Sequence, residues 1–592
     1  PSNEVTVPNG FGSFNNVLTV EGGGGAAPVA IDFQFVSEGS LRFSAIPEDQ
    51  EVLAFFNNRV VDVVRDEDGL SIVIPADAKD WERAWIRLYT ARNGQQGGDW
   101  LIPLKFGEVV IDTKELDRKD WHTSIMYFAM VDRFFNGNPT NDQPVQDSTV
   151  HPRANYQGGD IEGLRLKLAD GYFDALHTNT LWISPITQNP EDAWGLWNQG
   201  GPVSTFSGYH GYWPVSNIKP DHRFASPEEL HLFLDDAHAN EQNVLLDYVA
   251  NHVHELHPVF QKHPNWATNK YTADGRLNTQ LWDEERLTTW FDTFMPTLEL
   301  RNDTVAELMS DSALVWITEY DFDGFRHDAT KHIPMNFTRL LTAKIRAASD
   351  DHVYQIGETY GSDELIASYV GSGKVDAQFN FNLYDAAFEA FTQEGATFDR
   401  LRKALESSLT YYGHHHLMGN ISGNQDKPRF SSMASGHLSM SEDSKLAGWT
   451  REIPEPTERG YRKMAAMHAF NIAVPGIPIL YYGDEIALHG GNDPDNRKMM
   501  PFDFSPRQQQ LFDRIARLNE NRNNIMALNY GSTTLHQPDP NVLIIVRKYM
   551  EQEVRFFFNN SNEDRYLEDW DITVPADGEI YQTRNCGQFN QD

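Results

Sequence analysis

Three things are scarce in this 592-residue sequence: cysteine, basic residues relative to acidic ones, and long apolar runs. The single cysteine, Cys586, cannot form a disulfide within the chain or build a cysteine-based zinc site. The 49 basic and 85 acidic residues leave a net charge of −36, which repels phosphate backbones, so we expect no nucleic-acid partner. No run reaches the roughly 18–20 apolar residues that cross a bilayer, so we expect no membrane span. The oligomeric state does not follow from the sequence.

Aromatic residues are plentiful at 12 % of the chain, including 14 Trp. Most should lie in the core, because aromatic rings dominate buried area. Trp194 and Trp197 are different, since they stand among Gly, Asn and Gln without a periodic apolar context. We interpret these two as candidates for a surface on which a ligand stacks.

The chain divides into segments of different texture. Residues 1–115 contain short alternating runs between turns, which predicts an N-terminal β-sandwich. Residues 116–252 and 301–505 alternate short apolar runs with amphipathic segments, which is typical of βα repeats around a parallel sheet. Residues 253–300 interrupt these repeats as an insertion after the third strand. Residues 506–592 return to strand texture and predict a small antiparallel C-terminal β domain.

The repeat region contains eight strand candidates, which predicts an α/β fold, a (β/α)8 TIM barrel. The candidates are 125–131, 180–184, 244–247, 324–325, 353–356, 377–381, 417–421 and 477–481.

Polar residues follow four of these strands, at the end where a barrel of this kind opens into its active site. Asp247 ends the third strand, Asp328 follows the fourth, Glu358 the fifth and Asp426 the seventh. A single Asp after a strand is more often a turn or a helix cap. Four strand ends that meet at one mouth are harder to explain by packing.

Paired carboxylates are the groups that cleave glycosidic bonds. One acid protonates the departing oxygen, and a second carboxylate attacks or stabilises the oxocarbenium-like centre. Arg326 stands two residues before Asp328, so both side chains project to one side of an extended strand. A guanidinium there would keep Asp328 ionised, whereas Glu358 needs a raised pKa to act as an acid.

These segments resemble the conserved regions of glycoside hydrolase family 13, the α-amylase family. The resemblance covers about 120 to 505 and rests on 247–252 (DYVANH), 324–332 (GFRHDATKH), 126–142 (MYFAMVDRFFNGNPTND), 157–168 (QGGDIEGLRLKL), 209–213 (YHGYW) and 475–485 (PGIPILYYGDE). It implies that Asp328 is the nucleophile, Glu358 the acid and base, and Asp426 a third essential carboxylate.

The resemblance also implies a set of substrate contacts, with Lys331 and His332 on the leaving-group side, as in α-amylases and cyclodextrin glucanotransferases. The predicted contacts are His210, Tyr212, Trp213, Asp247, His252, Arg326, Lys331, His332, Gln425, Asp495 and Arg497. One position departs from the family, which usually has Asn-His-Asp where this chain has Asn424-Gln425-Asp426. A Gln amide can donate a hydrogen bond but cannot become cationic.

A loop rich in oxygen-bearing side chains is a candidate calcium site, because calcium takes six to eight oxygen ligands. On composition alone the loop is an Asx-rich turn. The resemblance implies instead the calcium site in the N-terminal part of the barrel, with Ca²⁺ bound by Asn136, Asn138, Asn141, Asp142, Gly158 and Asp160. A second family site often uses the residue at Asn251, whose partners the sequence does not reveal.

Two other motifs resemble a metal site and a phosphate-binding loop, but we predict neither. His414, His415 and His416 have no nearby carboxylates in sequence, so we interpret them as a loop. The run Gly490 to Asp495 lacks the Lys-Ser/Thr of a P-loop, and we interpret it as the eighth βα loop at the rim of the sugar site.

The leading hypothesis is a retaining hydrolase of α-1,4-glucans or maltooligosaccharides. Glucanotransferase, cyclomaltodextrinase and neopullulanase activities are the alternatives. Glucanotransferases usually carry further domains after the C-terminal sheet, so residues 506–592 favour hydrolysis, whereas a β domain before the barrel is typical of the cyclomaltodextrinase group. A non-catalytic glycan-binding protein is a third hypothesis, disfavoured because all three carboxylates are present. Large glucans are met outside the cytoplasm, so a secreted or periplasmic location is expected.

Overall fold

A closed barrel of eight parallel strands forms the centre of the computed structural model, which describes residues 4–8, 14–18, 28–37 and 39–584; Cys586 lies outside them. The strand order is β20-β19-β18-β17-β14-β13-β22-β21, and a parallel bridge between Phe379 and Gly419 joins the two ends. Each strand overlaps one of the eight predicted runs. The strands are β13 (Met126–Ala129), β14 (Thr180–Ile183), β17 (Asn243–Tyr248), β18 (Gly324–His327), β19 (Tyr354–Gly357), β20 (Ala377–Gln378), β21 (Gly419–Ile421) and β22 (Ile477–Tyr481).

Aromatic side chains fill the barrel beneath its open end. The rings of Phe128 and Trp182 stack with centroids 3.7 Å apart, and Trp182 contacts Phe379 at 5.1 Å. All three are buried. The inside of the barrel is therefore packed, and a ligand can enter only from the loops at the end of the strands.

Helices surround the strands, as the βα pattern predicts. A capping box begins α4 (Pro227–Ala239), where the Ser226 hydroxyl accepts the Glu229 N–H and Glu229 accepts the Ser226 N–H. The other long helices of this layer are α2 (Ile161–Ala169), α6 (Asp303–Thr318), α7 (Met335–Ala348), α9 (Phe381–Thr392), α10 (Asp399–Tyr412), α13 (Glu458–Ala473) and α14 (Pro506–Asn524). None of the helices in the described ranges combines the length and apolar character needed to cross a bilayer.

Two antiparallel sheets precede the barrel. Phe43 on one sheet packs edge-on against Trp100 on the other, with ring centroids 5.8 Å apart. This contact joins the sheets into the predicted sandwich. One sheet holds β3 (Phe33–Ser37), β4 (Ser40–Phe43), β7 (Val63–Asp66) and β8 (Gly69–Val73), and the other holds β5 (Glu51–Phe56), β6 (Arg59–Val61), β9 (Arg83–Arg92), β10 (Gln95–Gln96), β11 (Trp100–Lys105) and β12 (Glu108–Val109).

Two excursions extend the barrel loops. The segment 253–300 has little regular structure beyond α5 (Pro258–Lys262) and returns to the barrel through a bridge between His252 and Thr297. The loop after β14 carries a hairpin of β15 (Trp194–Trp197) and β16 (Ser204–Phe206).

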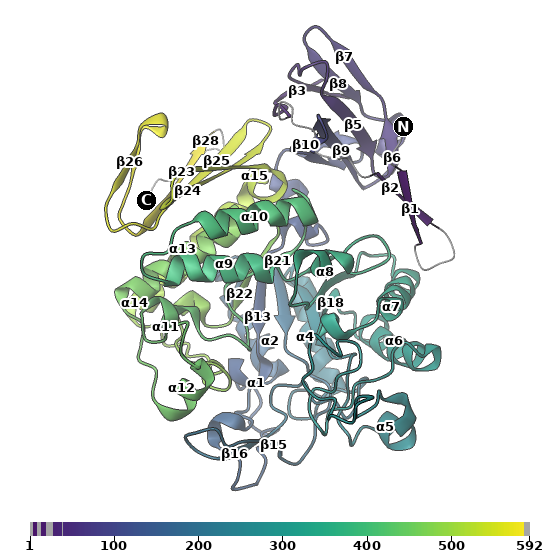
Figure 1. Cartoon of the computed structure of the whole chain (residues 1–592), viewed down its shortest axis with the longest axis vertical. Helices are drawn as coiled ribbons and strands as arrows, with labels where there is room; N and C mark the ends of the chain where they lie inside the picture. The colour runs from purple at the N-terminus through teal and green to yellow at the C-terminus, as the bar shows by residue number, and fades with distance from the viewer. Residues whose placement is uncertain (1–3, 9–13, 19–27, 38, 585–592) are drawn as a thin grey trace.

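The C-terminal antiparallel sheet begins later than the predicted segment 506–592. Residues 506–530 form α14, which packs against α13, and α15 (Met526–Tyr530). The sheet then consists of β23 (Ser532–Asp539), β24 (Val542–Tyr549), β25 (Gln552–Asn559) and β28 (Gly578–Arg584). The sandwich and this sheet lie at one end of the barrel, and β15 and β16 lie at the other (Figure 1).

Candidate active site

Arg326 lies at the centre of the polar residues that follow the strands. Its Nη1 donates to Oδ1 of Asp247 at 2.7 Å and to Oδ1 of Asp328 at 2.9 Å. Its Nη2 lies 2.9 Å from Oε1 of Glu358. The strands β17, β18 and β19 are neighbours in the sheet, so their ends bring these carboxylates to one guanidinium. The predicted convergence of these strand ends therefore occurs.

Glu358 is oriented by the turn that follows Asp328. Ala329 has φ +50°, a left-handed conformation that is uncommon for a residue with a Cβ. The turn aims the Ala329 N–H at Oε2 of Glu358, 3.0 Å away. The Lys331 N–H in turn donates to the Glu358 backbone carbonyl at 3.1 Å. These two hydrogen bonds hold Glu358 against the turn that follows Asp328.

The two carboxylates experience different electrostatic surroundings. Burial raises the pKa of Asp328, and the charge and hydrogen bond of Arg326 oppose that rise. Burial also raises the pKa of Glu358; Arg326 opposes it, but the negative charge of Asp328 raises it further. Asp426 also raises the pKa of Asp328, but this effect is smaller than that of the Arg326 hydrogen bond, whereas the repulsion of Asp328 on Glu358 outweighs the Ala329 hydrogen bond. Glu358 is therefore the better candidate to hold a proton.

Asp426 approaches the site from a different strand. It follows β21, its side chain is 56 % exposed, and Arg497 Nη2 lies 3.2 Å from its Oδ1. Its backbone N–H donates to Oδ1 of Asn424 at 3.0 Å. Asp426 pairs with Arg497 and not with Arg326, so this carboxylate stands on the open side of the cleft.

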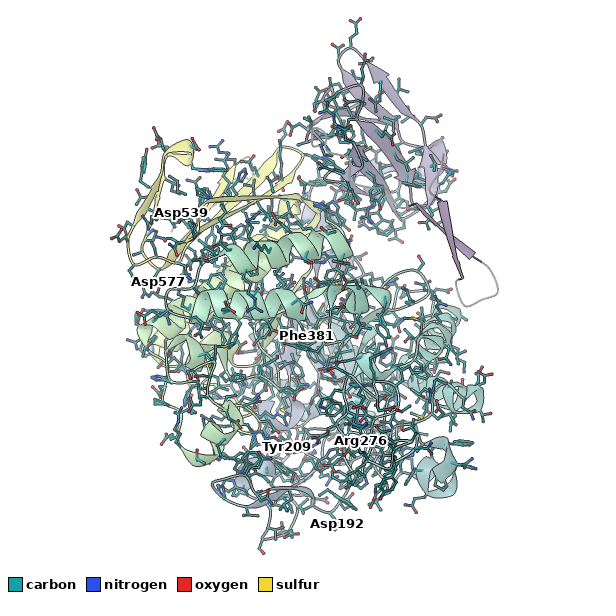
Figure 2. All side chains as sticks on the ribbon, in the orientation of Figure 1. Asp192, Tyr209, Arg276, Phe381, Asp539 and Asp577 are labelled. Atoms are coloured by element: carbon teal, nitrogen blue, oxygen red, sulfur yellow. The ribbon has the colours of Figure 1, made fainter. Side chains whose placement is uncertain are left out.

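These groups line a cleft of about 960 Å³ at the carboxyl ends of the strands. The side chain of Tyr209, which accepts a hydrogen bond from Arg497, lies in the half of the molecule opposite Asp539 of the C-terminal sheet (Figure 2). The predicted residues that line the cleft are His210, Tyr212, Trp213, His252, Asp328, Lys331, His332, Glu358, Gln425, Asp426 and Arg497.

Three predicted contacts do not line the cleft. Asp247 and Arg326 are fully buried beneath it, so they position other groups instead of touching a ligand. Asp495 is also buried; its Oδ2 accepts the Gly491 N–H at 2.7 Å and its Oδ1 lies 3.2 Å from Arg153. Asp493, two residues earlier, lines the cleft and pairs with Arg497 at 2.9 Å. The interpretation of 490–495 as a rim of the site therefore applies to Asp493, and not to Asp495.

The imidazoles around the cleft are uncharged in the neutral range. Burial lowers the pKa of His210 to about 3 and the pKa values of His252 and His332 to about 4. His210 Nδ1 accepts the Tyr212 N–H at 3.0 Å, and His332 Nδ1 donates to the Arg286 carbonyl at 2.7 Å. These rings act as neutral hydrogen-bonding groups.

Several cleft residues were not predicted. Trp282 from the insertion and Tyr360 are 37 % and 46 % exposed, and both line the cleft near the carboxylates. Lys427 lies 4.5 Å from the centroid of the Tyr360 ring. Tyr360 stands two residues after Glu358, and Lys427 directly follows Asp426, so their position after a strand end was an available signal. Trp282 lies in an irregular segment that gives no such signal.

The two tryptophans interpreted as stacking candidates have different surroundings. Trp197 lines the cleft and stacks on Trp449, with ring centroids 5.7 Å apart. Trp194 packs against His254 at 4.4 Å and Phe294 at 5.4 Å and does not line the cleft. Of the two, Trp197 lines the cleft, although most of its surface is buried.

The three consecutive histidines form a turn beside the N-terminal sandwich. His415 is buried, with Nε2 at 3.1 Å from the carbonyl oxygen of Asp99. Their role in the fold is to join the barrel to the sandwich, which agrees with their interpretation as a loop.

The candidate calcium loop surrounds a small group of oxygen atoms. The side-chain oxygens of Asn136 and Asn141 are buried and accept no hydrogen bond from the described residues. Asn136 Nδ2 donates to both oxygens of Asp142, at 3.0 and 2.9 Å. Gly158 has φ +88°, and a Cβ there would stand 2.5 Å from Asp142 Oδ1.

Asp160 and Asn138 complete this loop. Asp160 Oδ2 accepts the Asn138 N–H at 2.8 Å, and Asn138 Nδ2 donates to Glu229 at 3.0 Å. In the described ranges no three His, Cys, Asp or Glu residues form a metal cluster; this loop has two carboxylates and uses amide oxygens. The two unpartnered amide oxygens, and the space left by the missing Cβ of Gly158, suit a cation bound by oxygen atoms. Asn251 has a similar unpartnered Oδ1, and its Nδ2 lies 3.4 Å from Thr297 Oγ1.

Known proteins with similar sequences belong to a family of carbohydrate-active enzymes. The profile of the α-amylase catalytic domain matches residues 128–525. A cyclomaltodextrin glucanotransferase of Bacillus sp. (strain 17-1) is 25 % identical over 471 residues, which cover 74 % of this chain and 59 % of that protein. A cyclomaltodextrinase of Geobacillus thermopakistaniensis is 26 % identical over 460 residues, covering 75 % of this chain and 70 % of the other.

Solved structures show the same relationship. The crystal structure of an Anoxybacillus α-amylase superposes with a TM-score of 0.64 at 26 % identity, covering 78 % of this chain and 96 % of the other. The chain spans about 59 % of the length of the glucanotransferase that it matches. The match of the catalytic-domain profile over most of the barrel, together with the carboxylates around Arg326, shows that this chain belongs to the α-amylase family of glycoside hydrolases.

Proposed function

We propose that the protein hydrolyses α-1,4-glucosidic bonds in starch-type glucans or maltooligosaccharides with retention of configuration. The observation that carries the proposal is the placement of Asp328, Glu358 and Asp426 around one cleft, with Arg326 shared beneath the first two. Retaining glycosidases use one carboxylate as nucleophile and one carboxylic acid as proton donor.

In the first step an Asp328 oxygen attacks the anomeric carbon of the bound sugar. The bond from that carbon to the glycosidic oxygen breaks, and Glu358 gives its proton to the departing oxygen. Asp426, with its exposed carboxylate beside Arg497, stabilises the positive charge that develops on the sugar. The product of this step is a glycosyl ester on Asp328 and an ionised Glu358.

In the second step Glu358 takes a proton from water, whose oxygen attacks the anomeric carbon and releases Asp328. Two displacements at one carbon restore the α configuration. His210, Tyr212 and His252 hold the reacting sugar, and Lys331 and His332 contact the leaving group beside Trp282.

A second candidate is transfer to a sugar acceptor, or cleavage of cyclodextrin or pullulan. It is favoured by the similarity to a cyclomaltodextrin glucanotransferase and a cyclomaltodextrinase. Trp282 and Tyr360 present exposed rings near Glu358, where an acceptor sugar could displace the water. The cleft carries the complete carboxylate set, so a purely glycan-binding role is not favoured.

The proposal is tested by a product time course on soluble starch, pullulan and a cyclodextrin. We expect maltooligosaccharides from starch, with little elongation of added maltoheptaose. Cleavage confined to cyclodextrin or pullulan would assign the second candidate, and elongated or cyclic products would assign transfer. The absence of products from all three substrates would contradict the proposed activity.

We also propose that the loop around Asn136, Asn141 and Asp142 binds Ca²⁺, together with Asn138, Gly158 and Asp160. The buried, unpartnered amide oxygens support this assignment. Bound calcium would neutralise the two carboxylates and tie the loop after β13 to the start of α2. A secreted or periplasmic location is part of the same proposal, because large glucans are met there.

A further inference from the structure

Gln425 occupies the position where the family usually has histidine, and its contacts in this chain lie within the protein. The residue is 1 % exposed. Its Nε2 lies 2.8 Å from Oη of Tyr212. The backbone carbonyl oxygen of Gln425 accepts hydrogen bonds from Arg497 Nε at 3.0 Å and from Asn496 Nδ2 at 2.8 Å, and these bonds hold the backbone in place. The side chain is therefore fixed against Tyr212.

The direction of the hydrogen bond follows from the single proton of the Tyr212 hydroxyl. That hydroxyl lies 2.7 Å from Oδ2 of Asp247, a carboxylate that also accepts from Arg326. Because Tyr212 gives its proton to Asp247, the atom of Gln425 that faces the hydroxyl oxygen must be an N–H donor. The other atom, Oε1, is buried and accepts no hydrogen bond from the described residues. Gln425 thus acts here as a donor only.

These contacts form one continuous chain. Gln425 donates to Tyr212, Tyr212 donates to Asp247, and Arg326 donates to both Asp247 and Asp328. Such a network polarises along its length, and a group that reverses one link changes the others. If Tyr212 turned its proton away, Asp247 would lose a donor and would draw Arg326 more strongly, at the expense of Asp328.

We propose that Gln425 is a positioning residue for the nucleophile: its amide N–H fixes the Tyr212 proton on Asp247 and so keeps Arg326 shared with Asp328. This inference rests on the proposed function, because it assigns Asp328 as nucleophile. It differs from a substrate contact, since the free oxygen of Gln425 is buried. The charged groups that surround it are Asp426 and Arg497 on adjoining loops and, through Tyr212, Asp247 and Arg326.

The distinguishing variant is Gln425→Glu. An ionised Glu at this place would accept the Tyr212 proton and reverse the first link, whereas a protonated Glu can donate as the amide does. We expect kcat of Gln425→Glu to be about tenfold or more below that of the parent enzyme at neutral pH. As the pH falls, its kcat relative to the parent should recover. Gln425→Leu, which neither donates nor accepts, should lose kcat without this recovery.

A double-mutant cycle with Tyr212→Phe tests the route of the effect. Without the hydroxyl the chain is already broken, so adding Gln425→Glu should change kcat by less than twofold. The exposed Gln510 of α14 provides the matched control, and Gln510→Glu should leave the pH profile unchanged. Thermal unfolding of each variant reports whether it folds, and Gln425→Met, an apolar side chain of similar size without an N–H donor, replaces Gln425→Leu if the latter is unstable.

Equal relative rates of Gln425→Glu and Gln425→Leu at every pH would overturn the inference. So would a loss from Gln425→Glu that persists in the Tyr212→Phe background. A parent enzyme without activity on α-glucans would instead overturn the proposed function, so the two failures can be told apart.

Discussion

Arg326 on β18 donates a hydrogen bond at 2.9 Å to Asp328, which lies two residues later, just past the end of the strand, and lines the cleft. The guanidinium is fully buried and also contacts Asp247 and Glu358. One cation therefore balances three acidic groups in a region from which water is largely excluded.

Removal of the Arg326 charge should destabilise the protein as well as inactivate it. Arg326→Met leaves buried carboxylates without their partner, for which we expect a loss of about 3–5 kcal/mol in the free energy of unfolding. Arg276 offers a control, because its ion pairs with Asp274 and Glu284 are exposed to solvent and Arg276→Met should change the free energy of unfolding far less. Chemical denaturation measures both values, and an equal cost for the two variants would contradict the central role of Arg326.

The role of Glu358 as the proton donor predicts selective rescue by the leaving group. Glu358→Gln should lower kcat on maltoheptaose by roughly a thousandfold or more, because the departing sugar oxygen needs a proton. α-Maltosyl fluoride releases fluoride without that proton, so its rate of glycosyl transfer to Asp328 should fall much less. The pre-steady-state burst of product release from each substrate gives the comparison, because it reports the first step alone, whereas the second step needs Glu358 as base on both substrates. A similar loss on both would assign Glu358 to another role.

The buried histidines predict that stability falls on the acid side. Burial lowers the pKa of His468 to about 4, and its Nε2 lies 2.6 Å from Oδ1 of Asn519. A depressed pKa in the folded state means that this contribution is complete above the unfolded value of about 6.5 and is lost as the pH falls towards 4. His468→Gln should flatten the decline of Tm between pH 6.5 and 4. An unchanged slope would show that His468 does not take part.

Calcium binding at the loop of Asn136 and Asp142 predicts a change in thermal stability that is independent of activity. Addition of Ca²⁺ to chelator-treated protein should raise Tm, because a ligand that binds only the folded state stabilises it. Asp142→Ala should abolish the rise, since this carboxylate, which Asn136 Nδ2 holds through both oxygens, is one of the two charged groups of the loop. Asp503→Asn, on an exposed residue, should retain it. A rise that survives Asp142→Ala would place the ion elsewhere.

The sequence predicts the barrel and its carboxylates because both depend on local rules. Short apolar runs mark the parallel strands, and the ends of parallel strands meet at one mouth, so Asp328, Glu358 and Asp426 could be placed together. The alternation of side chains along a strand also placed Arg326 beside Asp328.

Other positions depend on how loops close, which no such rule describes. Asp493 and Asp495 are equally polar and two residues apart, yet only Asp493 reaches the cleft because Asp495 bonds to Gly491 and Arg153. Trp282 comes from an insertion with little regular structure. The donor role of Gln425 required the position of Tyr212, which lies 213 residues away in the chain.

The most direct test of the retaining mechanism is the anomeric configuration of the first products, followed by proton NMR during early hydrolysis of maltoheptaose. Asp328→Asn serves as the control and should form no product while keeping the Tm of a folded protein. Two displacements through Asp328 predict that the new reducing end appears as the α anomer before mutarotation. A first product in the β configuration would contradict a covalent intermediate on Asp328 and, with it, the account given for the site.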